Sequence, residues 1–141
     1  MGEDDVCVLG GRVMDPVAGW VFGTGLIALG AVIHYVKNQV ASGNIRRNSV
    51  IGIRTKATMS SDSAWEAGHA SASPMLTVTY LTAYTVGAAT LAISLALTLS
   101  DADNPAAIAV PLAGIVAVLT LLTAAAVKAN SAARAAGRSH R

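Results

Sequence analysis

The segment 48–69 carries the side chains of this sequence that are best suited to chemistry. It combines an amide, a guanidinium, two hydroxyls, an indole and an imidazole in a chain otherwise rich in Ala, Leu, Val and Thr. A guanidinium is a rigid fork of donors that suits phosphate, carboxylate or several backbone carbonyls. The chemistry indicated is therefore recognition through hydrogen bonds, and the candidate residues are Asn48, Gly52, Arg54, Thr55, Thr58, Trp65 and His69.

Covalent catalysis and metal binding are not indicated by this segment. His69 has no neighbouring Ser or Cys nucleophile with an oxyanion arrangement, and the nearby Asp62 and Glu66 form no recognisable dyad. The other histidines, His34 and His140, are too far apart along the chain to suggest a metal site. We therefore expect a protein that is not an enzyme, with no catalytic residue, metal or cofactor.

Two roles for the polar residues remain open from the sequence. In the first, Arg54 and Asn48 tie the segment to nearby helix ends while Thr55 and Thr58 satisfy backbone groups. In the second, Arg54 contacts a lipid headgroup or a protein partner. The residue types suit both roles.

A short amphipathic helix is expected at the end of this segment. Ser60, Ser61 and Asp62 offer an N-cap, and the helix is predicted to run to about Ala72, before Ser73-Pro74 changes the chain direction. Trp65 and His69 would lie together on this helix as anchors at the membrane interface. Small residues beside them would form a flat stripe suited to another helix or to the membrane surface: Ala64, Gly68 and Ala72.

The composition around this segment is that of a membrane protein. Hydrophobic residues make up 53% of the chain and charged residues 13%, and about 20 apolar residues suffice for a helix to cross about 30 Å of hydrocarbon. Three runs meet this length, at about 16–36, 74–99 and 105–127. Each is preceded by a capping side chain and begins with proline, as helix starts often do: Asp15-Pro16, Ser73-Pro74 and Asn104-Pro105. The predicted fold class is an all-α membrane protein with three transmembrane helices.

Charge divides the chain into an acidic N-terminal segment (1–15), a membrane domain (16–128) and a basic tail (129–141). The loop 38–73 is also basic, and Lys and Arg remain on the cytoplasmic side of membrane proteins. We therefore expect a multi-pass protein of the bacterial cytoplasmic membrane, with the N-terminus outside and the C-terminus inside. This division accounts for the net charge of +2, so nucleic acid is not an expected partner.

The predicted spans contain small residues and lack central ionisable ones. Asp, Glu, Lys and Arg are absent from their middle parts, which argues against a proton pump or coupled transporter. Gly19 and Gly23 are spaced for close helix approach. This pair predicts internal packing or, as an alternative, a homo-oligomer face.

The motif resembles the signature of the SdpI family of bacterial membrane proteins. The shared pattern is N-x3-G-x-R-T-x2-T-x6-W-x3-H, carried by Asn48, Gly52, Arg54, Thr55, Thr58, Trp65 and His69. Lys56 and Ala70 depart from the family pattern, which has Pro and a basic residue there. The resemblance implies a motif-bearing cytoplasmic loop between spans, immunity to a secreted toxin and signalling through a soluble regulator.

Three function classes follow from these observations. The first is an immunity or signalling protein that protects against a secreted antimicrobial peptide or toxin through the motif loop, as the resemblance implies. The second is a non-catalytic accessory subunit of a larger bacterial membrane complex, and the third is an enzyme or transporter acting on lipid. The expected partners are the lipid bilayer and a peptide toxin, a soluble regulator or other membrane subunits.

Overall fold

Three long helices, a short 3-10 helix and one folded loop make up the described chain. The computed structural model describes residues 16–102 and 104–138. Its elements are α2 (Pro16–Ala41), α3 (Asp62–Ser100), η1 (Pro105–Ile108) and α4 (Ala109–Arg138), and the described residues contain no strand. The predicted all-helical class is confirmed, with three helices long and apolar enough to cross a membrane.

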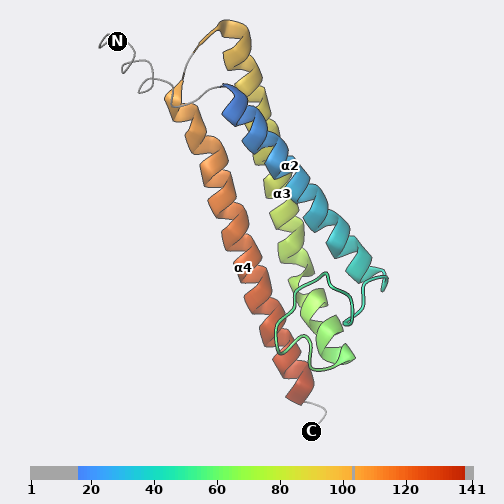
Figure 1. The fold of residues 1–141 in the computed structure, drawn as a ribbon. Coiled ribbons are helices and arrows are strands. Elements are labelled where there is room, and N and C mark those ends of the chain that lie inside the picture. The colour runs from blue at the N-terminus through green and yellow to red at the C-terminus, as the bar shows by residue number, and fades with distance from the viewer. Residues whose placement is uncertain (1–15, 103, 139–141) are drawn as a thin grey trace, which may run out of the picture.

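Helix α3 is the centre of the arrangement. It packs along both α2 and α4, whereas α2 and α4 contact each other little (Figure 1). The loop between α2 and α3 folds over the first turns of α3 and reaches α4 (Figure 1). The loop is therefore held at one end of the molecule, against the two helices that follow it in sequence.

The predicted short helix is not a separate element. Ser61 caps it as expected, its Oγ accepting a hydrogen bond from the Ala64 N–H at 3.1 Å. The predicted break at Pro74 is wrong, because α3 continues through this residue to Ser100. A proline inside a helix removes one backbone hydrogen bond. Here Ala72 before it and Leu76 after it pack with Ala125 and Ala129 of α4, so both parts of α3 contact the same neighbouring helix.

The other predicted helix bounds differ less from the structure. Asn104 caps the third apolar segment, its side chain accepting from the Ala106 N–H at 3.1 Å, and the first turn is 3-10 rather than α. Helix α2 continues past residue 36 to Ala41, and α4 continues to Arg138. Most of the predicted basic tail is therefore helical. The segment 1–15, with the expected Asp15 cap, lies outside the described residues.

Small residues form the contact between α2 and α3. Gly19 and Gly23 are buried, and a Cβ placed on Gly87 would lie 3.0 Å from the Gly23 carbonyl oxygen. Such close approach is how helices associate in lipid, where apolar burial gives no driving force. Gly23 of the predicted pair thus serves internal packing in the structure, and the homo-oligomer face stays a prediction.

Candidate functional site

Gly52 brings the loop backbone directly onto two aromatic rings. Its φ of +126° lies in the region that favours glycine. A Cβ added there would lie 2.5 Å from Cη2 of Trp65 and 3.1 Å from Nε2 of His69. Both the backbone angle and the space therefore require glycine at this motif position.

His69 ties the loop to α3 through both of its ring nitrogens. Nε2 accepts a hydrogen bond from the Ile53 N–H at 2.9 Å. Nδ1 lies 2.9 Å from the Trp65 carbonyl oxygen, and because a carbonyl only accepts, Nδ1 carries the proton. The neutral imidazole is thus the form that holds the loop.

The rings of Trp65 and His69 form the buried centre of the loop. Their centroids are 4.0 Å apart, and the two residues are only 4% and 7% exposed. The expectation that they anchor at the membrane interface is wrong, because the loop backbone covers them. Burial lowers the pKa of His69, against the opposing effect of its hydrogen bond to the Trp65 carbonyl.

Thr55 and Thr58 satisfy backbone groups of the loop, as predicted. Thr58 Oγ1 accepts from the Thr55 N–H at 2.9 Å and donates to the Ile53 carbonyl at 2.8 Å. Thr55 Oγ1 in turn accepts from the Thr58 N–H at 3.2 Å. Thr58 is fully buried, and its methyl lies where a Cβ on Gly68 would meet it at 2.8 Å. The pair closes the turn and packs it on α3.

The predicted stripe of small residues lies against α4. Ala64, Gly68 and Ala72 are all buried, and a Cβ on Gly68 would lie 3.1 Å from the Ala129 carbonyl oxygen. Another helix, rather than the membrane surface, is therefore what the stripe contacts. This contact places the first turns of α3, and with them Trp65 and His69, at a fixed position under the loop.

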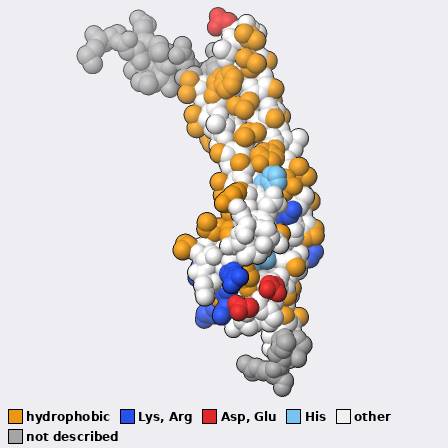
Figure 2. Space-filling view, turned by 90° about the vertical axis from the view of Figure 1, so that its right-hand side faces the viewer, with side chains coloured by type: hydrophobic (Ala, Val, Ile, Leu, Met, Phe, Trp, Pro, Cys, Tyr) orange, Lys and Arg blue, Asp and Glu red, His pale blue; other side chains and the backbone are white. Residues whose placement is uncertain are grey.

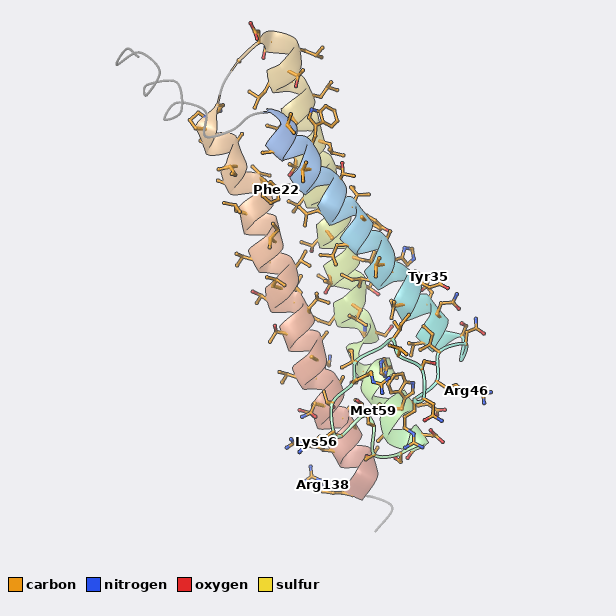
Figure 3. The ribbon with its side chains drawn as sticks, viewed as in Figure 1. Phe22, Tyr35, Arg46, Lys56, Met59 and Arg138 are labelled. Atoms are coloured by element: carbon orange, nitrogen blue, oxygen red, sulfur yellow. The ribbon has the colours of Figure 1, made fainter. Side chains whose placement is uncertain are left out.

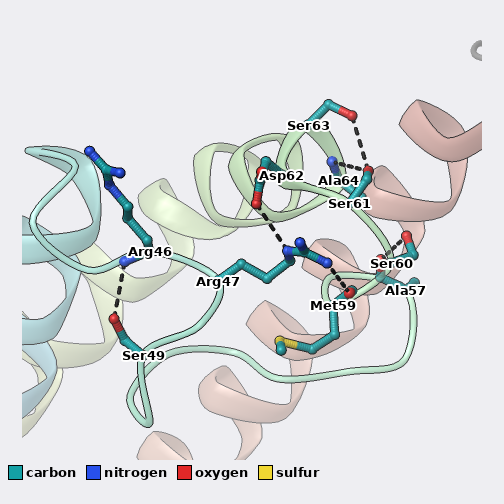
Figure 4. A network of polar contacts seen from close by, with 10 residues as sticks. All are labelled: Arg46, Arg47, Ser49, Ala57, Met59, Ser60, Ser61, Asp62, Ser63 and Ala64. Carbon is teal, nitrogen blue, oxygen red and sulfur yellow. Dashed lines mark hydrogen bonds and ion pairs between the residues drawn. The ribbon is translucent and has the colours of Figure 1, made fainter.

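Arg47 is a loop residue that the sequence pattern did not single out. Its Nε lies 2.9 Å from Asp62 Oδ1, and its Nη1 donates to the Met59 carbonyl at 3.1 Å (Figure 4). The side chain of the neighbouring Arg46 extends away from this network (Figure 4). Its backbone bonds to Ser49 instead: the Arg46 N–H donates to Ser49 Oγ at 3.2 Å, and the Arg46 carbonyl accepts from the Ser49 N–H at 2.8 Å. Nothing in the sequence distinguishes these two arginines, because the fold of the loop decides which one meets Asp62.

Arg54 and Asn48 remain on the outer surface of the loop. Both are exposed, and Arg54 Nη1 donates to the Ser49 carbonyl within the same loop. The Asn48 side chain makes no hydrogen bond within the part of the chain that the structure describes. The first of the two roles left open for them, a tie between the loop and the helix ends, is not what the structure shows. A hydrogen bond between α3 and the loop comes from His69, and the buried Thr58 packs its methyl against Gly68.

The motif thus divides into a buried part that shapes the loop and an exposed part that the loop displays. Gly52, Thr58, Trp65 and His69 belong to the first, with Thr55 in the closing turn. Asn48 and Arg54 belong to the second. In residues 16–102 and 104–138, His, Cys, Asp and Glu nowhere form a group of three that could hold a metal ion. The arrangement is suited to non-covalent binding.

A comparison with known protein families matches the same part of the chain. The model of the SdpI/YfhL protein family matches residues 44–126, more than half of the chain. The chain belongs to the SdpI family. The match begins in the loop, includes the whole motif and α3, and ends within α4. This SdpI-family protein is therefore a multi-pass membrane protein, with the family region centred on the loop and the helices that hold it.

No curated protein and no solved structure matches the chain.

Proposed function

We propose that this SdpI-family protein is an immunity or signalling protein of the bacterial cytoplasmic membrane, protecting its cell against a secreted antimicrobial peptide or toxin. The observation that carries the proposal is the division of the motif. One part of the motif makes the buried contacts that fold the loop. The other part, Asn48 and Arg54, is exposed on the outer surface of the loop and makes none of these buried contacts. In the proposed orientation the basic loop faces the cytoplasm.

Arg54 is the residue to which we assign recognition. One of its guanidinium nitrogens donates to the Ser49 carbonyl, which holds the side chain against the loop. Its remaining N–H donors have no partner among the described residues. A guanidinium oriented in this way suits a peptide carbonyl, a carboxylate or a phosphate of a toxin or a regulator. The proposed mechanism is binding alone, without bond making or breaking.

The test is a toxin challenge in the cell that normally makes the protein. A strain lacking the gene is complemented with wild type, Arg54→Ala or the control Arg46→Ala, and then exposed to the peptide fraction of its own culture supernatant. We expect Arg54→Ala to lose protection and Arg46→Ala to keep it, at equal protein levels in the membrane by immunoblot. Normal protection by Arg54→Ala would contradict the assignment of recognition to this residue.

Purification in mild detergent separates this proposal from an accessory subunit. A small peptide or a soluble regulator that co-elutes with wild type and not with Arg54→Ala, identified by mass spectrometry, supports immunity or signalling. A fixed set of membrane subunits that co-elutes with both forms would instead make the protein a component of a larger complex. In that case Arg54 would serve only the loop.

A further inference from the structure

The loop exposes two adjacent apolar side chains at its outer edge. Val50 is 88% exposed and Ile51 is 47% exposed, the former more than any large hydrophobic residue of the described helices. Exposed basic residues flank them on both sides in sequence, Arg46 and Arg54. Gly52, with its positive φ, then turns the chain back onto Trp65. We call Val50 and Ile51 the loop tip.

Two lysines, Lys128 and Lys37, indicate where along the helices the apolar segments end and the membrane surface begins. Lys128 follows the apolar segment of α4, and its carbonyl accepts a hydrogen bond from Ser71 Oγ of α3 at 3.4 Å. Lys37 follows the apolar segment of α2, and its Nζ lies 5.9 Å from the ring centre of Tyr80 of α3. Lysines at the ends of spans extend to the interface. The interface on this side therefore lies along α3 between Ser71 and Tyr80.

Part of the loop lies beside the same stretch of α3, between Ser71 and Tyr80. Ile53 packs against the cluster formed by Ala72, Ala125 and Ala129, beside Met75 and Leu76. All the α3 residues of this group lie between Ser71 and Tyr80 in sequence. Figure 1 shows the loop running down from the end of α2, climbing back to about the height of that end, and then descending to the start of α3. The loop tip, two and three residues before Ile53, is therefore close to the interface.

We propose that the loop tip inserts into the lipid interface on this side of the membrane, with Arg46 and Arg54 at the level of anionic headgroups. Lipid is the occupant because the tip continues the apolar surface of the helices, and the flanking charges are complementary to anionic lipid. Figure 2 shows this apolar surface extending down to the charged end of the molecule. Apolar residues bordered by basic ones are typical of interfacial anchors.

Insertion of the loop tip would give the loop a fixed orientation towards the bilayer. The buried part of the motif attaches the loop to α3, and the tip attaches it to lipid. The insertion of Val50 and Ile51 stands or falls independently of any role in immunity, whereas the headgroup contact shares Arg54 with the recognition proposed above.

Spin labelling tests the proposal on the full chain. The single native cysteine is replaced (Cys7→Ser), and a nitroxide is attached through Val50→Cys in vesicles of phosphatidylethanolamine and phosphatidylglycerol. The control is Lys56→Cys, an exposed position of the same loop that lies near the far end of α4, by Arg138 (Figure 3). Power saturation then compares accessibility to oxygen, which concentrates in lipid, with accessibility to a water-soluble nickel chelate.

We expect the Val50 label to favour oxygen over the nickel chelate, and the Lys56 label to show the reverse. A Val50 label as accessible to nickel as the control would overturn the proposal. So would a label shielded from both reagents, because that result indicates a protein partner over the tip. Neither position lies in the buried part of the motif, and unchanged Trp65 emission in a Trp20→Phe background verifies that the loop remains folded.

A change of lipid composition tests whether Arg46 and Arg54 hold the loop tip through anionic headgroups. In vesicles of phosphatidylcholine alone, we expect nickel accessibility at Val50 to rise towards that at Lys56. Equal values in neutral and anionic vesicles would show that Arg46 and Arg54 do not hold the tip through anionic headgroups, and would overturn that part.

Discussion

The spans and the loop of this protein are packed by opposite means. Between α2 and α3 the backbones approach closely at Gly23 and Gly87, and Leu91 and Ile27 fill the space that a Cβ on these glycines would take. In the loop a large indole is buried, and two hydrogen bonds of Ile53 hold the backbone beside it: its N–H donates to His69 Nε2, and its carbonyl accepts from Thr58 Oγ1. The difference follows from the solvent, because helices in lipid gain from close contact whereas a loop in water gains from removing apolar surface.

Glycine is needed in both regions, for different reasons. At Gly87 a helix backbone must come close to another helix, while its own φ is ordinary. At Gly52 the backbone must come close to Trp65 and also adopt a positive φ. Substitutions at these positions should therefore damage one region and spare the other.

The largest effect is expected from Gly52→Val. The new side chain would overlap Trp65, and a β-branched residue strongly disfavours the φ of +126°. We expect the loop to lose about 3 kcal/mol or more of stability, with fast tryptic cleavage at its basic residues and red-shifted Trp65 emission in a Trp20→Phe background. The helical circular dichroism should persist.

Gly43 supplies the matched control for this substitution. It also has a positive φ, +76°, but a Cβ there meets nothing within 4 Å. Gly43→Ala should therefore lower the stability of the loop by about 1 kcal/mol, because only the preference of alanine against a positive φ opposes it. Equal damage from the two changes would show that the contact with Trp65 does not hold the loop.

The next effect is expected in the spans, from Gly87→Val. Its Cβ would lie 3.0 Å from a backbone oxygen of Gly23 and 2.9 Å from Ile27, and such overpacking costs about 1–3 kcal/mol. The melting temperature in detergent, followed by circular dichroism, should fall, while the folded loop keeps its resistance to trypsin. Ala88→Val, at the exposed neighbouring position, should leave the melting temperature nearly unchanged.

A smaller effect is expected from pH. His69 lies ahead of the apolar part of α3, under the loop, and its pKa is lowered from 6.5 by burial. Below pH 6.5 the opened loop binds a proton at His69 that the folded loop resists, so loop stability falls by at most about 1.4 kcal/mol per pH unit. Above pH 6.5 His69 is neutral in both the folded and the opened loop, so no loop stability is lost to its protonation.

The measurement is tryptic cleavage of the loop as a function of pH, with the intrinsic pH dependence of trypsin corrected on an unfolded peptide of the same sequence. Protection should decline as the pH falls from 6.5 towards the lowered pKa of His69. In His69→Leu this decline should disappear, although the loop is weaker at every pH because the Ile53 N–H loses its acceptor. A decline of equal size in the variant would assign the pH dependence to another group.

The smallest effect is expected from Arg47→Ala. Its ion pair joins side chains that are 31% and 80% exposed, and exposed pairs contribute about 0.2–1 kcal/mol. Loop protection should change only slightly, and the change should vanish at high salt as the charges are screened. A loss as large as that of Gly52→Val would mean that the surface network, rather than the buried rings, holds the loop.

Part of the site could be predicted from residue types alone. Thr55 and Thr58 satisfy backbone groups as predicted, because a hydroxyl three residues from another can close a turn locally. The role of Trp65 was predicted wrongly, and of the two roles left open for Arg54 the structure does not show the tie to the helix ends. A Trp near a membrane indicates the interface, and only the return of the chain at Gly52 shows that the indole is covered instead.

Residue types and spacing were enough to predict the three apolar helices, the cap at Asn104, a cap among Ser60, Ser61 and Asp62, and the family motif. Hydropathy and capping depend on neighbouring residues, so they can be seen in the sequence. The folded chain was needed to show that α3 continues through Pro74, that Arg47 rather than Arg46 meets Asp62, and which motif residues are buried. These outcomes depend on contacts between segments far apart in the chain. Ala72 and Leu76 pack against α4 on either side of Pro74, and the fold of the loop sets each side chain towards α3 or towards solvent.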